Sequence, residues 1–61
     1  MPPLSTLISC VQKEVDYRIR RYPYWVAESK ITQAYADEQI NSMKWVLYVL
    51  QNLNNFMEKL R

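Results

Sequence analysis

Glycine and histidine are both absent from this 61-residue chain, and cysteine occurs once, at Cys10. Glycine supplies the positive-φ positions of tight hairpin turns and phosphate-cradling loops, so its absence favours an all-helical chain. A single cysteine excludes an intrachain disulfide, and without histidine a zinc site would need carboxylates and one thiol. We therefore expect no metal site and no cofactor.

The missing residue types also argue against catalysis. General acid–base and nucleophilic sites most often rely on histidine. Cys10 has no imidazole partner, and a small packing residue is the simpler interpretation of it. Asp37 and Glu38 are adjacent, so on a helix they diverge, and the electrostatics of a helix start explains them better than a shared substrate. We predict that the chain is not an enzyme.

Long apolar runs are missing as well. The longest one, Trp45 to Leu50, is far shorter than the roughly 20 residues that span a bilayer. The N-terminus has no basic region followed by a long apolar one, so it does not resemble a signal peptide. A membrane-surface helix over residues 43–60 is the weaker interpretation, because that segment holds few basic residues. We expect a cytoplasmic protein that does not contact a membrane.

What the chain does contain is a high proportion of apolar residues for its length. They make up 49% of the sequence, which is too many for a disordered chain. A domain of about 60 residues buries only about 60% of the surface that its unfolded chain exposes, and it usually needs disulfides, a metal or a partner. With the first two excluded, self-association or binding to something larger remains.

Two apolar patterns of helical period divide the chain, which we expect to form a single domain over residues 1–61. The first predicts a helix over about residues 4–21, capped by a hydroxyl residue at its start, Ser5 or Thr6. Pro23 should end or kink this helix. The row that defines it consists of Leu4, Ile8, Val11, Val15, Ile19 and Tyr22.

After Pro23 the pattern predicts a short turn over residues 23–28 and a second helix over about residues 33–59, with Thr32 as its cap. The fold class is therefore an all-α helical hairpin with a proline-kinked connection. Apolar side chains cover roughly 200° of the second helix, whereas one neighbouring helix needs only about 100°. The first helix cannot cover this face alone.

Pairing across a two-fold axis would bury the remaining apolar face. Two hairpins would then form a homodimeric four-helix bundle through the second helix. Core or dimer packing explains these side chains better than a groove for an unrelated helix. The predicted dimer interface consists of Met43, Trp45, Val46, Val49, Leu50, Leu53, Phe56 and Met57.

Positive charge gathers around the proline, although the formal net charge of the whole chain is only +2. Acidic residues four positions earlier are expected to pair with two of the arginines, Glu14 with Arg18 and Asp16 with Arg20. Three interpretations stay open: a packed corner with a solvated basic rim, a surface for a protein partner, or a nucleic-acid contact. The candidate partner-binding residues are Arg18, Arg20, Arg21, Tyr24, Trp25 and Lys30.

The run YPYWVAESKITQAYADEQINSMK, which follows an arginine-rich helix, resembles a pattern in short proteins encoded by bacteriophages and prophages. That pattern has Tyr-Pro-x-Trp-Val, a Lys-hydrophobic step, Ala-x-x-Glu and a later Met. It has glycine where this chain has Ser29, and glutamate where this chain has Gln39. The matching positions are Arg18, Arg20, Arg21, Tyr22, Pro23, Trp25, Val26, Lys30, Ile31, Ala36 and Met43.

The resemblance implies a phage origin, hence the cytoplasm of an infected bacterium, and it implies no established activity. Together with the patterning it predicts a small interaction protein that binds a host or phage protein and modulates it, for instance by inhibition. The alternative is a nucleic-acid-binding accessory protein. It would use Arg18, Arg20, Arg21, Lys30 and Lys44.

Overall fold

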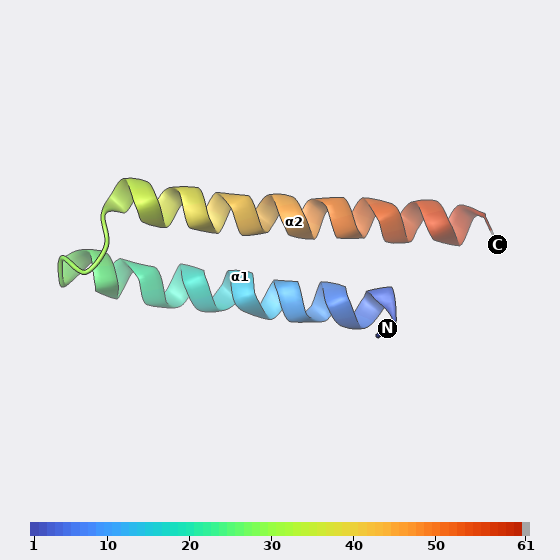
Figure 1. Cartoon of the computed structure of the whole chain (residues 1–61), viewed down its shortest axis with the longest axis horizontal. Coiled ribbons are helices and arrows are strands. Elements are labelled where there is room, and N and C mark those ends of the chain that lie inside the picture. The colour runs from blue at the N-terminus through green and yellow to red at the C-terminus, as the bar shows by residue number, and fades with distance from the viewer. Residues whose placement is uncertain (61) are drawn as a thin grey trace.

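A computed structural model describes residues 1–60, and within them it contains two α-helices and no strand (Figure 1). The first helix, α1, spans Leu4–Ala27, and the second, α2, spans Gln33–Lys59. They run side by side in opposite directions, and the Cα trace measures 49 × 17 × 16 Å (Figure 1). The predicted all-α helical hairpin is confirmed. Arg61, the last residue of the predicted domain, lies outside the described residues.

Pro23 lies inside α1 and does not end it, so the predicted helix end at residue 21 and the predicted turn over residues 23–28 are wrong. A proline costs a helix the hydrogen bond that its N–H would donate. The packing of the following turn offsets this loss. The rings of Tyr22 and Trp25 stack with their centroids 5.3 Å apart, and both side chains are half-buried.

α1 ends in a left-handed turn at Ser29, whose φ is 61°. The N–H of Lys30 donates to the carbonyl of Trp25 at 2.9 Å, and the N–H of Ser29 donates to that of Val26 at 3.0 Å. This pair of bonds is a Schellman motif, which satisfies carbonyls that a helix end leaves without partners. The connection therefore covers residues 28–32 and contains no proline, in contrast to the proline-kinked connection that was predicted.

The two helices begin differently. The Oγ1 of Thr32 accepts a hydrogen bond from the N–H of Tyr35 at 3.1 Å, which confirms the predicted cap of α2. No side chain caps α1, so the expected cap by Ser5 or Thr6 is wrong. The N–H of Thr6 instead donates to the backbone carbonyl of Pro3 at 3.0 Å.

The core consists of one row of side chains from each helix. Among residues 1–60, the buried apolar side chains are Val15, Ala36 and Leu47, at 3%, 1% and 9% exposed. Half-buried side chains continue both rows at alternating spacings of three and four, which is the periodicity of a helix with one neighbour. The rows consist of Leu4, Ile8, Val11, Val15, Arg18, Tyr22 and Trp25 on α1, and Ala36, Ile40, Met43, Leu47, Leu50 and Asn54 on α2.

α2 extends beyond the start of α1 (Figure 1). Arg18 of α1 contacts Gln39 of α2, and the two helices run in opposite directions. Moving back along α1 from Arg18 to Leu4 therefore corresponds to moving forward along α2 from Gln39 by the same number of residues, since both helices rise about 1.5 Å per residue. The start of α1 lies level with about residue 53 of α2. The last turns of α2 therefore have no part of α1 beside them.

Candidate interaction surfaces

A second apolar row on α2 faces solvent. Its members recur at spacings of three and four, so they share one face of the helix. At about 100° per residue, this face lies about 140° round α2 from the row that packs on α1. We call this row the α2 stripe. It consists of Trp45, Val49, Leu53, Phe56 and Leu60, which are between 45% and 71% exposed.

A shallow groove lies at one end of the α2 stripe. It is lined by Trp45, Val46, Val49 and Leu50, all of them apolar, and it encloses about 270 Å³. The ring of Tyr48 packs edge-on against the indole of Trp45, with the centroids 5.4 Å apart. Trp45, one wall of the groove, therefore packs against a side chain of its own helix.

The predicted dimer interface divides between the two rows of α2. Met43 and Leu50 are half-buried and continue the row that packs on α1. Leu60 was not among the predicted interface residues, although it ends the α2 stripe and is exposed. The remaining predicted residues are exposed, namely Trp45, Val46, Val49, Leu53, Phe56 and Met57.

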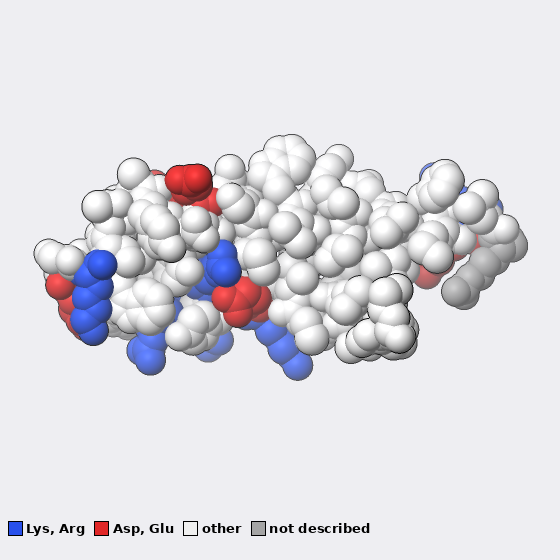
Figure 2. All heavy atoms as spheres, viewed as in Figure 1, with Lys and Arg blue, Asp and Glu red and all other residues white. Residues whose placement is uncertain are grey.

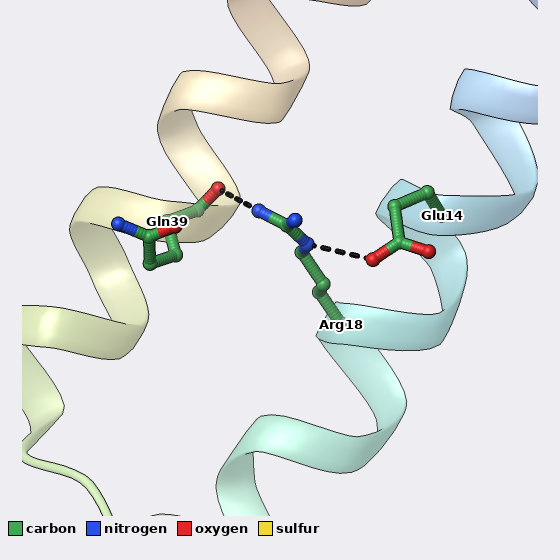
Figure 3. Close-up of polar contacts among 3 residues, drawn as sticks. All are labelled: Glu14, Arg18 and Gln39. Atoms are coloured by element: carbon green, nitrogen blue, oxygen red, sulfur yellow. Dashed lines mark hydrogen bonds and ion pairs between the residues drawn. The ribbon is translucent and has the colours of Figure 1, made fainter.

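Arg18 lies between the helices and not on the outer surface (Figure 3). Its Nε donates to the Oε1 of Glu14 at 2.9 Å, and its Nη1 donates to the backbone carbonyl of Gln39 at 3.0 Å. The guanidinium carbon also lies 5.9 Å from the ring centroid of Tyr22. The predicted pair with Glu14 is confirmed. Because only 19% of its side chain is exposed, Arg18 belongs to the hairpin's own interface.

A mixed aromatic and basic surface covers the outer face of α1. Tyr17, Arg20, Arg21 and Tyr24 line a groove of about 520 Å³. Their spacing of three, one and three residues places all four on one face of a continuous helix. Tyr24 is the more exposed of the two tyrosines, at 66% against 41% for Tyr17. We call these four residues the arginine–tyrosine surface.

The two arginines of this surface lack carboxylate partners among residues 1–60. The predicted pair between Asp16 and Arg20 is wrong. The Nε of Arg20 donates to the backbone carbonyl of Asp16 at 3.4 Å, while the Asp16 carboxylate accepts from Gln12 at 3.1 Å. Arg20 and Arg21 therefore present two uncompensated positive charges between two tyrosine rings.

The other two predicted binding residues lie outside the arginine–tyrosine surface. Trp25 is half-buried and stacked on Tyr22. Lys30 is paired, with its Nζ 3.0 Å from a carboxylate oxygen of Glu28. Exposed pairs of this kind are weak, so Lys30 remains accessible to a stronger partner.

Sequence reasoning missed Tyr17 as a surface residue. The signal was present, because Tyr17 and Tyr24 are seven residues apart and therefore two helical turns apart on the same face. The predicted helix end before Pro23 broke this register. A helix continued to residue 27 would have placed both rings beside the two arginines.

On the face shown in Figure 2, charged side chains lie over the half of the hairpin nearer the connection and again at the far end of α2, with mostly uncharged surface between them. Among residues 1–60, no group of three or more Cys, Asp or Glu side chains is placed to hold a metal ion. Neither α1 nor α2 combines the length and the apolar character that crossing a bilayer requires. Cys10 is exposed, so its interpretation as a packing residue is wrong.

Two surfaces thus stand out in the described part of the chain, the α2 stripe and the arginine–tyrosine surface. No protein-family model, no curated protein and no solved structure matches the chain.

Proposed function

We propose that this chain is a small, non-catalytic interaction protein that works as a homodimer. The observation that carries the proposal is the α2 stripe, an apolar face that α1 does not reach. Burying a large apolar side chain stabilises a protein by roughly 1.5–3 kcal/mol relative to leaving it in water. A second copy placed against the stripe recovers this free energy for both chains. The resulting assembly contains four helices, as in the predicted four-helix bundle.

The size of the exposed face suits a dimer. Taken with the neighbouring Val46 and Met57, the α2 stripe contributes seven large apolar side chains that are each between 43% and 71% exposed. At roughly 100 Å² each, about half of what burial of a large side chain removes from water, their exposed area approaches the about 800 Å² per partner of a standard protein interface. It also exceeds the few hundred Å² of contiguous apolar surface that monomeric proteins usually expose. This supports self-association as the use of the stripe.

Each copy would then bind a host or phage protein through the arginine–tyrosine surface. Tyrosine and arginine are among the residues that contribute most to binding at protein interfaces. The two uncompensated arginines favour a partner with an acidic face. The phage setting, and with it the bacterial cytoplasm, comes from the resemblance carried by the segment around Pro23. Modulation would follow from occlusion of the surface that the partner uses.

A capture experiment from bacterial lysate tests this function. The baits are the unmodified chain, a double variant with Arg21→Ala and Tyr24→Ala, and the control Tyr35→Ala, which removes an exposed tyrosine from α2. We expect one bacterial protein to be recovered by the unmodified chain and by the control, and lost with the double variant. Equal recovery by all three baits would remove the arginine–tyrosine surface from the proposal.

Nucleic-acid binding remains the second candidate, because one observation favours it. Arg20 and Arg21 have no carboxylate partners among the described residues, and two tyrosine rings flank them. Arginines that grip phosphates and aromatic rings that stack on bases are the usual elements of a single-strand contact. Such a contact would use Arg20 and Arg21 without Arg18, which is engaged between the helices.

A further inference from the structure

We infer that the homodimer is antiparallel and reciprocal, with Phe56 of each chain inserted in the groove that Trp45, Val46, Val49 and Leu50 form on the other chain. This inference rests on the homodimer proposed above and specifies its register. Its occupant is a second copy of this chain, because the chain itself carries both the groove and the side chain that fills it.

The unequal lengths of the helices supply the first argument. Phe56 lies on the last turns of α2 and Leu60 is its C-terminal cap, so both lie beyond the start of α1, and both are exposed. The groove lies further back on α2, where α1 runs alongside (Figure 1). The uncovered apolar end of α2 in one copy can therefore pack against the two helices of a second copy, where it acts as a third helix. A two-fold axis makes the same contact twice, since each residue pair across it occurs in both directions.

The spacing of the α2 stripe supplies the second argument. Trp45 and Phe56 are eleven residues apart, and so are Val49 and Leu60. An antiparallel pair of helices with Phe56 opposite Val49 therefore also sets Trp45 opposite Leu60. The two-fold axis then passes close to Leu53, which meets its own counterpart. One register thus buries every member of the stripe in both chains.

Side-chain size supplies the third argument. On either side of the central Leu53, the antiparallel register sets a large ring against a smaller aliphatic chain, Phe56 against Val49 and Trp45 against Leu60. A parallel register would set each ring against its own counterpart and Val49 against Val49. Well-packed interfaces alternate large and small side chains, because paired rings overpack and paired small residues leave voids. The opposed helix dipoles favour the antiparallel arrangement too.

This register determines where the partner-binding surfaces lie. Each hairpin points away from the two-fold axis, so the two arginine–tyrosine surfaces face opposite ends of an elongated dimer. At 1.5 Å per residue the antiparallel dimer is roughly 70 Å long, compared with 49 Å for one chain. Each end can then engage one copy of the partner without contact between the two.

Cysteine pairing tests the register. Two variants are made, one with Val49→Cys and one with Phe56→Cys, and both also carry Cys10→Ser. A tag on one variant gives the two chains different masses, so that their linked products can be told apart. A disulfide needs Cα atoms roughly 4.4–6.8 Å apart. We expect mild oxidation of the mixture to link one chain of each variant. Each variant alone should stay unlinked, because its two cysteines would lie about 10 Å apart along the axis.

Each result decides the inference. Linkage of either variant with itself would show a parallel pairing or an antiparallel one centred on that residue, and either would overturn the register, while the proposed homodimer stands. A dimeric mixture that forms no linked product would also overturn the register. An unmodified chain that stays monomeric at these concentrations would overturn the homodimer together with the inference. Circular dichroism of each variant checks that the helices are intact.

Small-angle scattering of the unmodified dimer is the second measurement, because either cysteine substitution can weaken association. We expect a dimeric mass and a maximum dimension of roughly 70–80 Å, from a rise of 1.5 Å per residue plus side chains. A dimeric mass with a maximum dimension of roughly 50–60 Å would place the hairpins side by side over their whole length and overturn the inference.

Discussion

Arg18 joins the two helices of the hairpin through the backbone carbonyl of Gln39, with 3.0 Å between its Nη1 and the carbonyl oxygen (Figure 3). That oxygen lies inside α2, where a carbonyl uses one lone pair within the helix and has a second available. Glu14 holds the same guanidinium from the other side at 2.9 Å. A charged residue thus occupies one position in the row of α1 that otherwise packs apolar side chains.

This bridge predicts a difference between two arginines of the same helix. Arg18→Ala should lower the free energy of unfolding by about 1–3 kcal/mol, because it leaves a half-buried carbonyl and carboxylate without their donor. Arg20→Ala should change it by no more than about 0.5 kcal/mol, since that side chain is exposed. Urea denaturation at matched protein concentration measures both. Equal losses would show that Arg18 does not bridge the helices.

The left-handed turn at Ser29 predicts a gain from glycine. Ser29→Gly should raise the free energy of unfolding by about 0.5–1 kcal/mol, because a residue without a Cβ adopts positive φ at little cost. The matched control is Ser9→Gly in α1, where the same exchange should cost about 0.5 kcal/mol of helix propensity. Thermal denaturation followed by circular dichroism compares the two. A loss of stability at position 29 would contradict the turn geometry.

The continuation of α1 through Pro23 predicts that this proline is unfavourable. Pro23→Ala should raise the free energy of unfolding by about 1–3 kcal/mol, because alanine restores the missing donor and suits a helix interior. Pro3→Ala, which lies before the first helical residue, should change it by no more than about 0.5 kcal/mol. If Pro23→Ala destabilised the protein in urea, the helix would be shown to end near residue 21.

The two candidate partners of the arginine–tyrosine surface respond differently to salt. We expect no retardation of duplex or single-stranded DNA in a gel shift at either low or moderate ionic strength, if a protein is the partner. A nucleic-acid contact through Arg20 and Arg21 would retard DNA at low salt. The logarithm of its affinity would fall with that of salt concentration at about −0.9 per phosphate contact on a duplex. If the unmodified chain retarded DNA and the double variant with Arg20→Ala and Arg21→Ala did not, the result would favour the nucleic-acid candidate.

Local chemistry made several features predictable from sequence. The cap of α2 by Thr32 follows from a hydroxyl side chain before a helical pattern, and the pair of Glu14 with Arg18 follows from their spacing. The width of the apolar face on α2 also follows from residue order alone. The exposure of Trp45 and Val49 agrees with that estimate, since α1 covers a single row of α2.

Other features depended on opposing local contributions to the stability of the helix, and the sequence does not show which contribution is larger. Proline usually ends a helix, but here the stacking of Tyr22 on Trp25 and the Schellman turn at Ser29 outweigh that preference. Without that helical turn, the register that places Tyr24 on the same face as Tyr17 and the two arginines could not be found. Arg18 was assigned to an outer surface because a charged residue in an apolar row is recognised only once its partners across the interface are known.

The central claim is that α2 has a wider apolar face than its own chain covers, so that a second copy lies against Trp45 and Val49. Sedimentation equilibrium at micromolar concentrations measures this directly. We predict a mass near twice the 7.4 kDa of one chain, reduced to the monomer by Val49→Glu and retained by Asn55→Glu on the polar face of α2. A folded, helical species of 7.4 kDa throughout that concentration range would contradict the account.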